Sequence, residues 1–121
     1  MKILGRRSEN MSKNYKTIFS RYAEDDLTEI IDYYIPINPD YAEKLLNVFE
    51  KRVSELKKYP ERGRIVPELE EQNINDYREL IEGNYRIIFA IQENTVIIHT
   101  IIDSRRNVEE IIISKLMRYY E

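Results

Sequence analysis

The chain has 121 residues, of which 42% are hydrophobic and 34% charged, and it contains no cysteine. These values are typical of one soluble globular domain, and they exclude a disulfide-stabilised scaffold or an enzyme that uses a thiolate. No apolar run approaches the roughly 20 residues of a membrane helix, and the N-terminus lacks the apolar segment of a secretory signal, so we expect a cytoplasmic protein.

The formal net charge is −3. Proteins that bind phosphates over a broad surface usually carry a positive balance, so any role with nucleic acid would depend on a local cluster of arginines. Residues 1–14 show no periodicity, and we expect them to form a flexible N-terminal arm. The sequence does not decide whether translation starts at Met1 or Met11. Residues 15–121 are expected to form a single domain.

The domain begins with a predicted strand over residues 15–20, where apolar and polar residues alternate. Ser20 or Arg21 then starts a helix that must end before Pro36, because proline cannot continue a helix. Its first turn holds the acidic residues 24–26, which we expect on the solvated face. Asn38 and Pro39 predict the start of a second helix that extends to about Lys58. The short link indicates an antiparallel helical hairpin.

Residues 59–76 are expected to form a long loop, because this segment contains two prolines and mixed charges. Loops of this length are usually functional or mobile. Arg62 and Arg64 lie close together in it and are candidate binding residues.

Three strands are predicted next, at Tyr77–Ile81, Tyr85–Gln92 and Thr95–Ile102. Asn107, with Glu110 three residues later, then resembles the capping box of a final helix. The predicted fold class is therefore α+β, with an N-terminal strand, a helical hairpin, a three-stranded antiparallel meander and a C-terminal helix.

Side chains alternate across a strand, so the meander has two faces. One face carries no charge and is expected to lie under the helical hairpin; it comprises Tyr85, Ile87, Phe89 and Ile91 opposite Val96, Ile98, Thr100 and Ile102. The other face holds Arg86 and is expected to be open.

The turn between the first two strands decides which residues join Arg86. His99, on the third strand, is expected on the same face whichever turn forms. A three-residue loop over residues 82–84, the preferred arrangement, adds Arg78 to this face, with Arg105 and Arg106 at the rim. A two-residue turn would instead bring Glu79 to this face and send Arg78 inward.

Each of these residues also has a structural interpretation. Arg86 could pair with Glu79 or Glu82 across the strands. Arg105 and Arg106 could be solvated charges before the last helix. His99 could be a hydrogen-bonded residue beneath that helix.

In order, these segments resemble the RelE/ParE superfamily of type II toxins. The resemblance covers roughly residues 15–110 and rests on the motifs PERGR (Pro60–Arg64), YREL (Tyr77–Leu80) and NYRIIFAI (Asn84–Ile91), and on the arginine pair after the last strand. It implies the RelE-like fold and a cognate antitoxin that binds the toxin in a hetero-oligomer. It also implies either cleavage of mRNA on the ribosome or poisoning of DNA gyrase.

Within this resemblance, Arg86 matches the arginine of the YR motif and Arg105 the arginine beyond the last strand. Arg78 stands where the family usually has a lysine. These three would form the catalytic set of a ribonuclease, which needs cations at the phosphate. However, Leu80 occupies a second lysine position, and Ile111 lies near the position of a late tyrosine.

These departures, together with the acidic balance, favour the ParE branch and inhibition of gyrase. The alternatives are a ribosome-dependent mRNA endonuclease and a non-toxic relative that only binds a partner, so whether the protein is an enzyme stays open. Candidate binding residues are Arg62, Arg64, His99 and Arg106. We expect no cofactor and no metal, because one histidine and scattered carboxylates show no ligand spacing.

Overall fold

The computed structural model describes residues 14–116. The predicted arm at residues 1–14 therefore lies outside the described residues except for Asn14. The described residues contain no helix that is long and apolar enough to cross a membrane.

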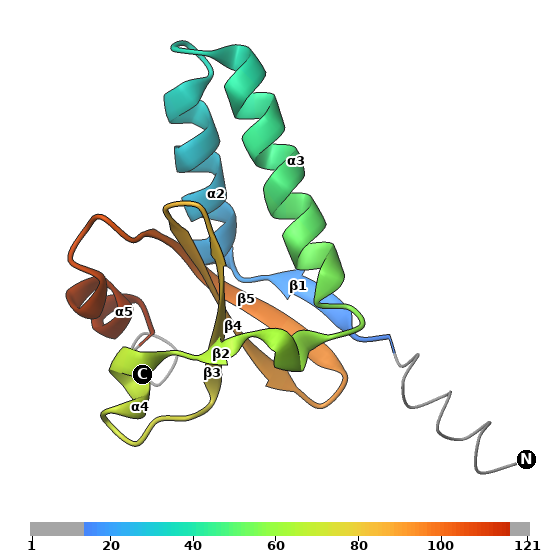
Figure 1. The fold of residues 1–121 in the computed structure, drawn as a ribbon, viewed down its shortest axis with the longest axis vertical. Helices are drawn as coiled ribbons and strands as arrows, with labels where there is room; N and C mark the ends of the chain where they lie inside the picture. The colour runs from blue at the N-terminus through green and yellow to red at the C-terminus, as the bar shows by residue number, and fades with distance from the viewer. Residues whose placement is uncertain (1–13, 117–121) are drawn as a thin grey trace, which may run out of the picture.

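Residues 14–116 fold into a five-stranded sheet with a long helical hairpin on one side (Figure 1). The strands are β1 (Lys16–Phe19), β2 (Arg64–Ile65), β3 (Tyr77–Glu82), β4 (Tyr85–Gln92) and β5 (Thr95–Asp103). The order in the sheet is β1-β5-β4-β3-β2, with β1 parallel to β5 and the other neighbours antiparallel. The helices are α2 (Arg21–Tyr34), α3 (Pro39–Glu55), α4 (Pro67–Glu70) and α5 (Val108–Leu116), with a 3-10 turn at Pro60–Arg62. The predicted element order and the predicted meander are confirmed.

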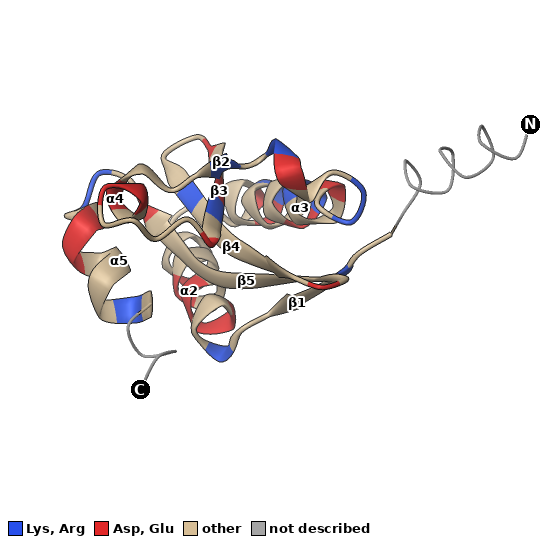
Figure 2. Cartoon of the chain, turned by 90° about the horizontal axis from the view of Figure 1, so that it is seen from below, with Lys and Arg blue, Asp and Glu red and all other residues tan. Residues whose placement is uncertain are grey.

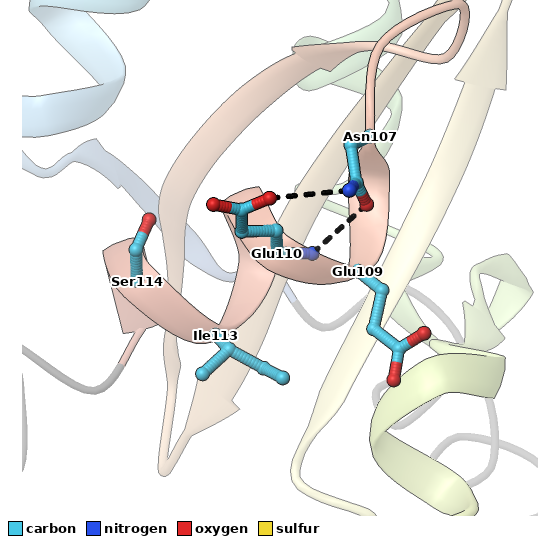
Figure 3. Close-up of a pocket in the computed structure, with 5 residues that line it drawn as sticks. All are labelled: Asn107, Glu109, Glu110, Ile113 and Ser114. Carbon is cyan, nitrogen blue, oxygen red and sulfur yellow. Dashed lines mark hydrogen bonds between the residues drawn. The ribbon is translucent and has the colours of Figure 1, made fainter.

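The helix starts that were predicted from the sequence are formed by side-chain caps. Ser20 Oγ accepts a hydrogen bond from the backbone N–H of Ala23 at the start of α2, and Asn38 Oδ1 does the same for α3. At α5, Asn107 and Glu110 bond each other reciprocally, with the Glu110 N–H 3.3 Å from Asn107 Oδ1 (Figure 3). These bonds satisfy N–H groups that a helix start otherwise leaves without partners.

The segment predicted to be a long loop instead contains the 3-10 turn, β2 and α4. Val66 and Leu69 are buried in it, and they pack in a second core with Tyr77, Ile88 and Ile112. The second face of the sheet is therefore covered by α4 and α5 rather than open. These elements are too short to show a periodic pattern in the sequence, which explains the wrong prediction.

The turn between β3 and β4 has two residues, because Glu82 pairs directly with Tyr85. The preferred three-residue loop is wrong. Gly83 adopts φ +58°, a left-handed conformation that tight hairpin turns require and that glycine adopts without steric cost. Arg78 consequently pairs with Phe89 on the hairpin side of the sheet, and Glu79 lies on the same face as Ile88.

The register between β4 and β5 follows the prediction at one end only. Phe89 lies opposite Ile98 as expected, but a bulge follows, so that Ile88 pairs with Thr100. Ile101 therefore joins the core beneath the helical hairpin and Ile102 joins the second core, which corrects the predicted places of Thr100 and Ile102. One extra residue moves every later side chain to the other face.

Asp26 connects three elements in the interior. Its Oδ2 accepts hydrogen bonds from the Thr100 hydroxyl at 2.6 Å and from the N–H of Ile101 at 2.9 Å. The ammonium group of Lys115 pairs with its other oxygen. The expectation that Asp26 lies on a solvated face is therefore wrong; this carboxylate fixes α2 and α5 to β5.

Gly63, just before β2, packs tightly against the side chain of Phe89. A Cβ atom at this position would lie 2.5 Å from Cζ of Phe89 and 3.0 Å from the carbonyl oxygen of Glu79. We predict that Gly63→Ala lowers the free energy of unfolding by about 2–3 kcal/mol, because the core must shift to admit the methyl group. Gly83→Ala is the control, because its Cβ meets nothing within 4 Å. The only expected loss is the roughly 1 kcal/mol that alanine needs to adopt the left-handed backbone conformation. Equal losses in urea denaturation would contradict this packing.

The extra residue of the bulge is His99, whose ring lies edge-on to Tyr77 with centroids 5.3 Å apart. The residue is only 8% exposed, and burial lowers the pKa of His99 to about 4. The unfolded chain therefore binds a proton at higher pH than the folded chain does. We predict that stability falls as pH drops from about 6.5 to 4, by roughly 1–3 kcal/mol more in the native chain than in His99→Gln. The prediction is refuted if the free energies of unfolding of the native chain and of His99→Gln, measured by denaturant titration, change in parallel with pH.

Candidate functional site

The guanidinium of Arg86, the first candidate, lies in a buried network of charges. Its Nε donates a hydrogen bond to Glu79 Oε1 at 2.6 Å. Its two terminal nitrogens donate to the two oxygens of Glu68, on α4, at 2.8 and 2.7 Å. This two-pronged geometry is the one in which arginine binds a carboxylate or a phosphate most strongly. Glu68 therefore occupies the edge of Arg86 that a phosphate would need.

Glu79 completes the network from the middle of β3. Its side chain is 0% exposed, and its second oxygen accepts a hydrogen bond from Nε of Arg64 at 2.6 Å. A buried carboxylate is tolerated only when cations and hydrogen bonds compensate for its lost hydration. The hydrogen bonds from Arg86 also lower the pKa of Glu68. The structural interpretation of Arg86, an ion pair with Glu79, is confirmed.

Arg78 does not share a surface with Arg86, so the expected grouping is wrong. It points to the hairpin side of the sheet, where its Nη1 donates hydrogen bonds to the carbonyl oxygens of Gly63 at 2.7 Å and Glu61 at 3.3 Å. The two-residue turn accounts for this position, because it reverses the face on which each β3 side chain lies. Arg78 therefore holds the 3-10 turn against the sheet.

Arg105 and Arg106 lie elsewhere, in a groove between the helical hairpin and the ends of β4 and β5. The groove consists of two adjoining hollows of about 520 and 270 Å³ that share Tyr34, Tyr85 and Arg105. We call it the tyrosine–arginine groove and define it by Tyr33, Tyr34, Tyr41, Lys44, Tyr85, Arg105 and Arg106.

The aromatic side of the groove is a continuous set of edge-on contacts. The ring of Tyr34 lies 5.0 Å from that of Tyr33 and 4.8 Å from that of Tyr41, measured between centroids. Burial, together with the neighbouring Tyr34 hydroxyl, raises the pKa of Tyr85. Tyr85 is therefore neutral at physiological pH. The four tyrosines offer apolar rings with hydroxyl groups at the edge.

The cationic side of the groove is exposed. Arg105 donates to both oxygens of Asp103 at 2.9 and 2.6 Å, yet its side chain remains 60% exposed. The same contact lowers the pKa of Asp103. Within residues 14–116, Arg106 and Lys44 form no salt bridge, although Arg106 also contributes to the lowered pKa of Asp103. Glu29, Glu82 and Asp103 also line the two hollows. The groove therefore offers cations and carboxylates next to aromatic surface.

Further exposed apolar side chains lie at or near the tip of the hairpin, which is at the top of Figure 1. Tyr33 is 64% exposed, and Ile35, Ile37 and Tyr41 are also exposed. Exposed apolar and aromatic side chains near arginines are typical of protein–protein contact surfaces, where tyrosine and arginine are enriched.

A further hollow of about 400 Å³ lies against α5 (Figure 3). All five of its lining residues come from α5 and its cap: Asn107, Glu109, Glu110, Ile113 and Ser114. Two of them are carboxylates and none is a cation, so residues from different elements do not converge there. We therefore do not assign it a function.

The remaining sequence-predicted candidates are dispersed. Arg64 belongs to the buried network, and Arg62 lies over the ring of Tyr59, at 4.5 Å from its centroid. His99 is in the interior against Tyr77. The structure thus brings together Arg64 with Arg86, and Arg105 with Arg106, but not the three proposed catalytic arginines.

Sequence reasoning missed Glu68 and the tyrosines that define these two places. Glu79 was considered as a partner of Arg86, but the preferred three-residue loop placed it on the opposite face; Gly83-Asn84 was the signal for the two-residue turn. Glu68 lies one residue after Pro67, a residue that often starts helices. Tyr34 and Tyr41 lie on opposite arms of the hairpin, so only its closure reveals their contact.

Comparisons with known proteins agree with this architecture. Residues 17–108 match the sequence model of the family described as ParE toxin of type II toxin-antitoxin system, parDE. No curated protein sequence matches the chain at the threshold applied.

Two solved structures share the fold. One is a chain of the chromosomal ParDE toxin–antitoxin system from P. aeruginosa, with a TM-score of 0.61 and 23% identity over 78% of this chain and 97% of that chain. The other belongs to the toxin–antitoxin complex RelBE2 from Mycobacterium tuberculosis, with a TM-score of 0.53 and 20% identity over 74% and 98% of the two chains. Because the family match spans most of the chain, this protein belongs to the ParE toxins of type II toxin–antitoxin systems, within the RelE/ParE superfamily.

Proposed function

We propose that this chain inhibits growth by binding and poisoning DNA gyrase, and that a cognate antitoxin neutralises it in a hetero-oligomer. The observation that carries the proposal is the bidentate pairing of Arg86 with Glu68 inside the buried network.

Cleavage of a phosphodiester requires cations that converge on the phosphate and stabilise the charge that develops there. In this chain Arg86 is enclosed by carboxylates. Arg78 faces the opposite side of the sheet, and Arg105 pairs with Asp103. The three do not form a common phosphate site, which supports action by contact rather than by catalysis.

The tyrosine–arginine groove supplies a surface suited to contact. Residues that dominate the binding energy of protein interfaces are most often tyrosine, tryptophan and arginine. The groove presents Tyr33 and Tyr41 with Arg105 and Arg106 at its rim. We assign gyrase to this surface, and we assign the antitoxin to the same surface, where it would block access to the target. The two matched structures carry titles that name toxin–antitoxin systems, which supports such a partner.

A ribosome-dependent mRNA endonuclease is the second candidate. The exposed guanidinium of Arg105, next to Arg106, favours it, because both groups could reach a phosphate without unfolding the network. Under this alternative, catalysis would require a set of residues different from the one predicted from the sequence.

We predict that the purified chain stops plasmid supercoiling by gyrase and causes cleaved DNA to accumulate. Tyr33→Ser should weaken this inhibition at least about tenfold, because the ring is exposed in the groove and contributes hot-spot energy. The matched control is Ile113→Ser, which removes another exposed apolar side chain, on α5, and should leave inhibition unchanged.

Three outcomes separate the candidates. Undiminished supercoiling without cleaved DNA would reject gyrase as the target. New cuts in mRNA in a translating extract, mapped by primer extension, would then establish the endonuclease. If neither effect appears and uncontrolled expression leaves growth unchanged, the chain is a non-toxic relative.

A further inference from the structure

Another concave site lies at the C-terminal end of α3. Its volume is about 450 Å³, and it is lined by Asn14, Lys51, Ser54, Glu55, Lys57, Lys58, Tyr59 and Arg62. The tyrosine–arginine groove uses the other part of α3, from Tyr41 to Val48. The two sites share no lining residue, so the site at the end of α3 is separate from the proposed contact surface.

The site gathers cations without a carboxylate partner. Within residues 14–116, Lys51, Lys57, Lys58 and Arg62 take part in no salt bridge, although five other cations do. Figure 2 shows Lys and Arg in the turn that follows α3. In a chain with net charge −3, this is a locally positive surface that attracts anions.

The two nearby carboxylates do not neutralise the site. Glu55 accepts a hydrogen bond from Arg52 at 3.3 Å, and Glu61 accepts one from the hydroxyl of Tyr15 at 3.3 Å. Arg52 offsets the charge of Glu55, whereas the neutral hydroxyl leaves Glu61 charged. The four cations of the site outnumber these two carboxylates, so a positive balance remains.

The backbone that carries the site is fixed from several sides. The N–H of Tyr15 donates to the carbonyl oxygen of Lys57 at 2.7 Å. Leu56 and Pro60 are buried on either side of the exposed residues 57–59. Gly63 then lies against Phe89. The site is therefore held in place before a ligand arrives, which reduces the entropy lost on binding.

An aromatic platform stands among the cations. Tyr59 is 46% exposed, and the guanidinium of Arg62 lies 4.5 Å from the centroid of its ring. Proteins that bind single-stranded nucleic acids combine these two features, with bases stacked on aromatic rings and phosphates held by lysine and arginine. A duplex keeps its bases stacked inside and cannot place one on the ring, and an acidic peptide has no base to stack there.

We propose that this pocket binds single-stranded nucleic acid, with one base stacked on Tyr59 and the adjacent phosphates held by Lys57 and Lys58. Its volume is within the range of sites for small ligands, so it admits a single unstacked nucleotide. The shared chemistry of RNA and DNA, a base and a phosphodiester, is what the site recognises.

The test measures binding of labelled twelve-nucleotide oligo-U and oligo-dT to the purified full-length chain by fluorescence anisotropy, at several salt concentrations. We expect at least one of the two to bind, with an affinity that falls as salt rises. Lys57→Gln and Lys58→Gln should each reduce the slope of log affinity against log salt by about 0.7, since each removes one phosphate contact. Tyr59→Leu should weaken binding roughly 5- to 100-fold through lost stacking.

Arg21→Gln is the matched control, because Arg21 is an exposed cation outside this pocket; it should change neither affinity nor slope. Circular dichroism confirms that each variant is folded. The proposal is overturned if neither strand binds, if a twelve-base-pair duplex binds as tightly as the single strand, if poly-glutamate competes equally well, or if Tyr59→Leu has no effect. These assays contain no gyrase, so their failure leaves the proposed function untouched.

Discussion

The buried carboxylate of Glu79 is the constraint on which the second face of the sheet depends. An ionised group with no exposure must be paired, because the free energy of its lost hydration is otherwise several kcal/mol. Arg86 and Arg64 supply the two cations, from β4 and β2. Glu68 then balances Arg86 and fixes α4 over the sheet. One charge in the middle of β3 therefore determines how β2, β4 and α4 meet.

This arrangement has a functional consequence. A guanidinium whose Nε and terminal nitrogens all bond carboxylates has no free edge for a phosphate. The sequence predicts that this face of the sheet binds phosphate. In the structure, the same face holds a buried ion-pair network that stabilises the fold. The exposed aromatic and cationic groups lie elsewhere, in the tyrosine–arginine groove and at the end of α3. One fold can host different activities in this way, because function depends on the site rather than on the fold.

The sequence predicts the elements better than it predicts their faces. Caps at Ser20, Asn38 and Asn107 and the helix limit at Pro36 are local signals, and each helix start agrees with the structure. The faces depend on single-residue shifts at two places, the turn at Gly83 and the bulge at His99.

The placement of site residues could be predicted only in part for the same reason. The wrong predicted register placed Arg78 on the same face as Arg86, and it placed Glu79 on the face beneath the helical hairpin. The tyrosine–arginine groove could not be predicted, because Tyr34, Tyr41 and Tyr85 come from three elements and meet only when the hairpin packs on the sheet. The cation cluster after α3 was visible as KKYPERGR (residues 57–64), but its lack of carboxylate partners is a property of the fold.

The central claim is that Arg86 supports the fold and does not act on a substrate. The double variant Arg86→Met/Glu79→Met tests it most directly, because it replaces the buried pair by apolar side chains of similar size, an exchange that is often neutral or stabilising. Arg64 and Glu68, which lose their ion-pair partners in this variant, are partly exposed and can be hydrated. The measurement is growth inhibition on induced expression, with folding checked by thermal unfolding. The account predicts a folded variant that inhibits growth like the native chain. A folded variant that has lost the inhibition would contradict it.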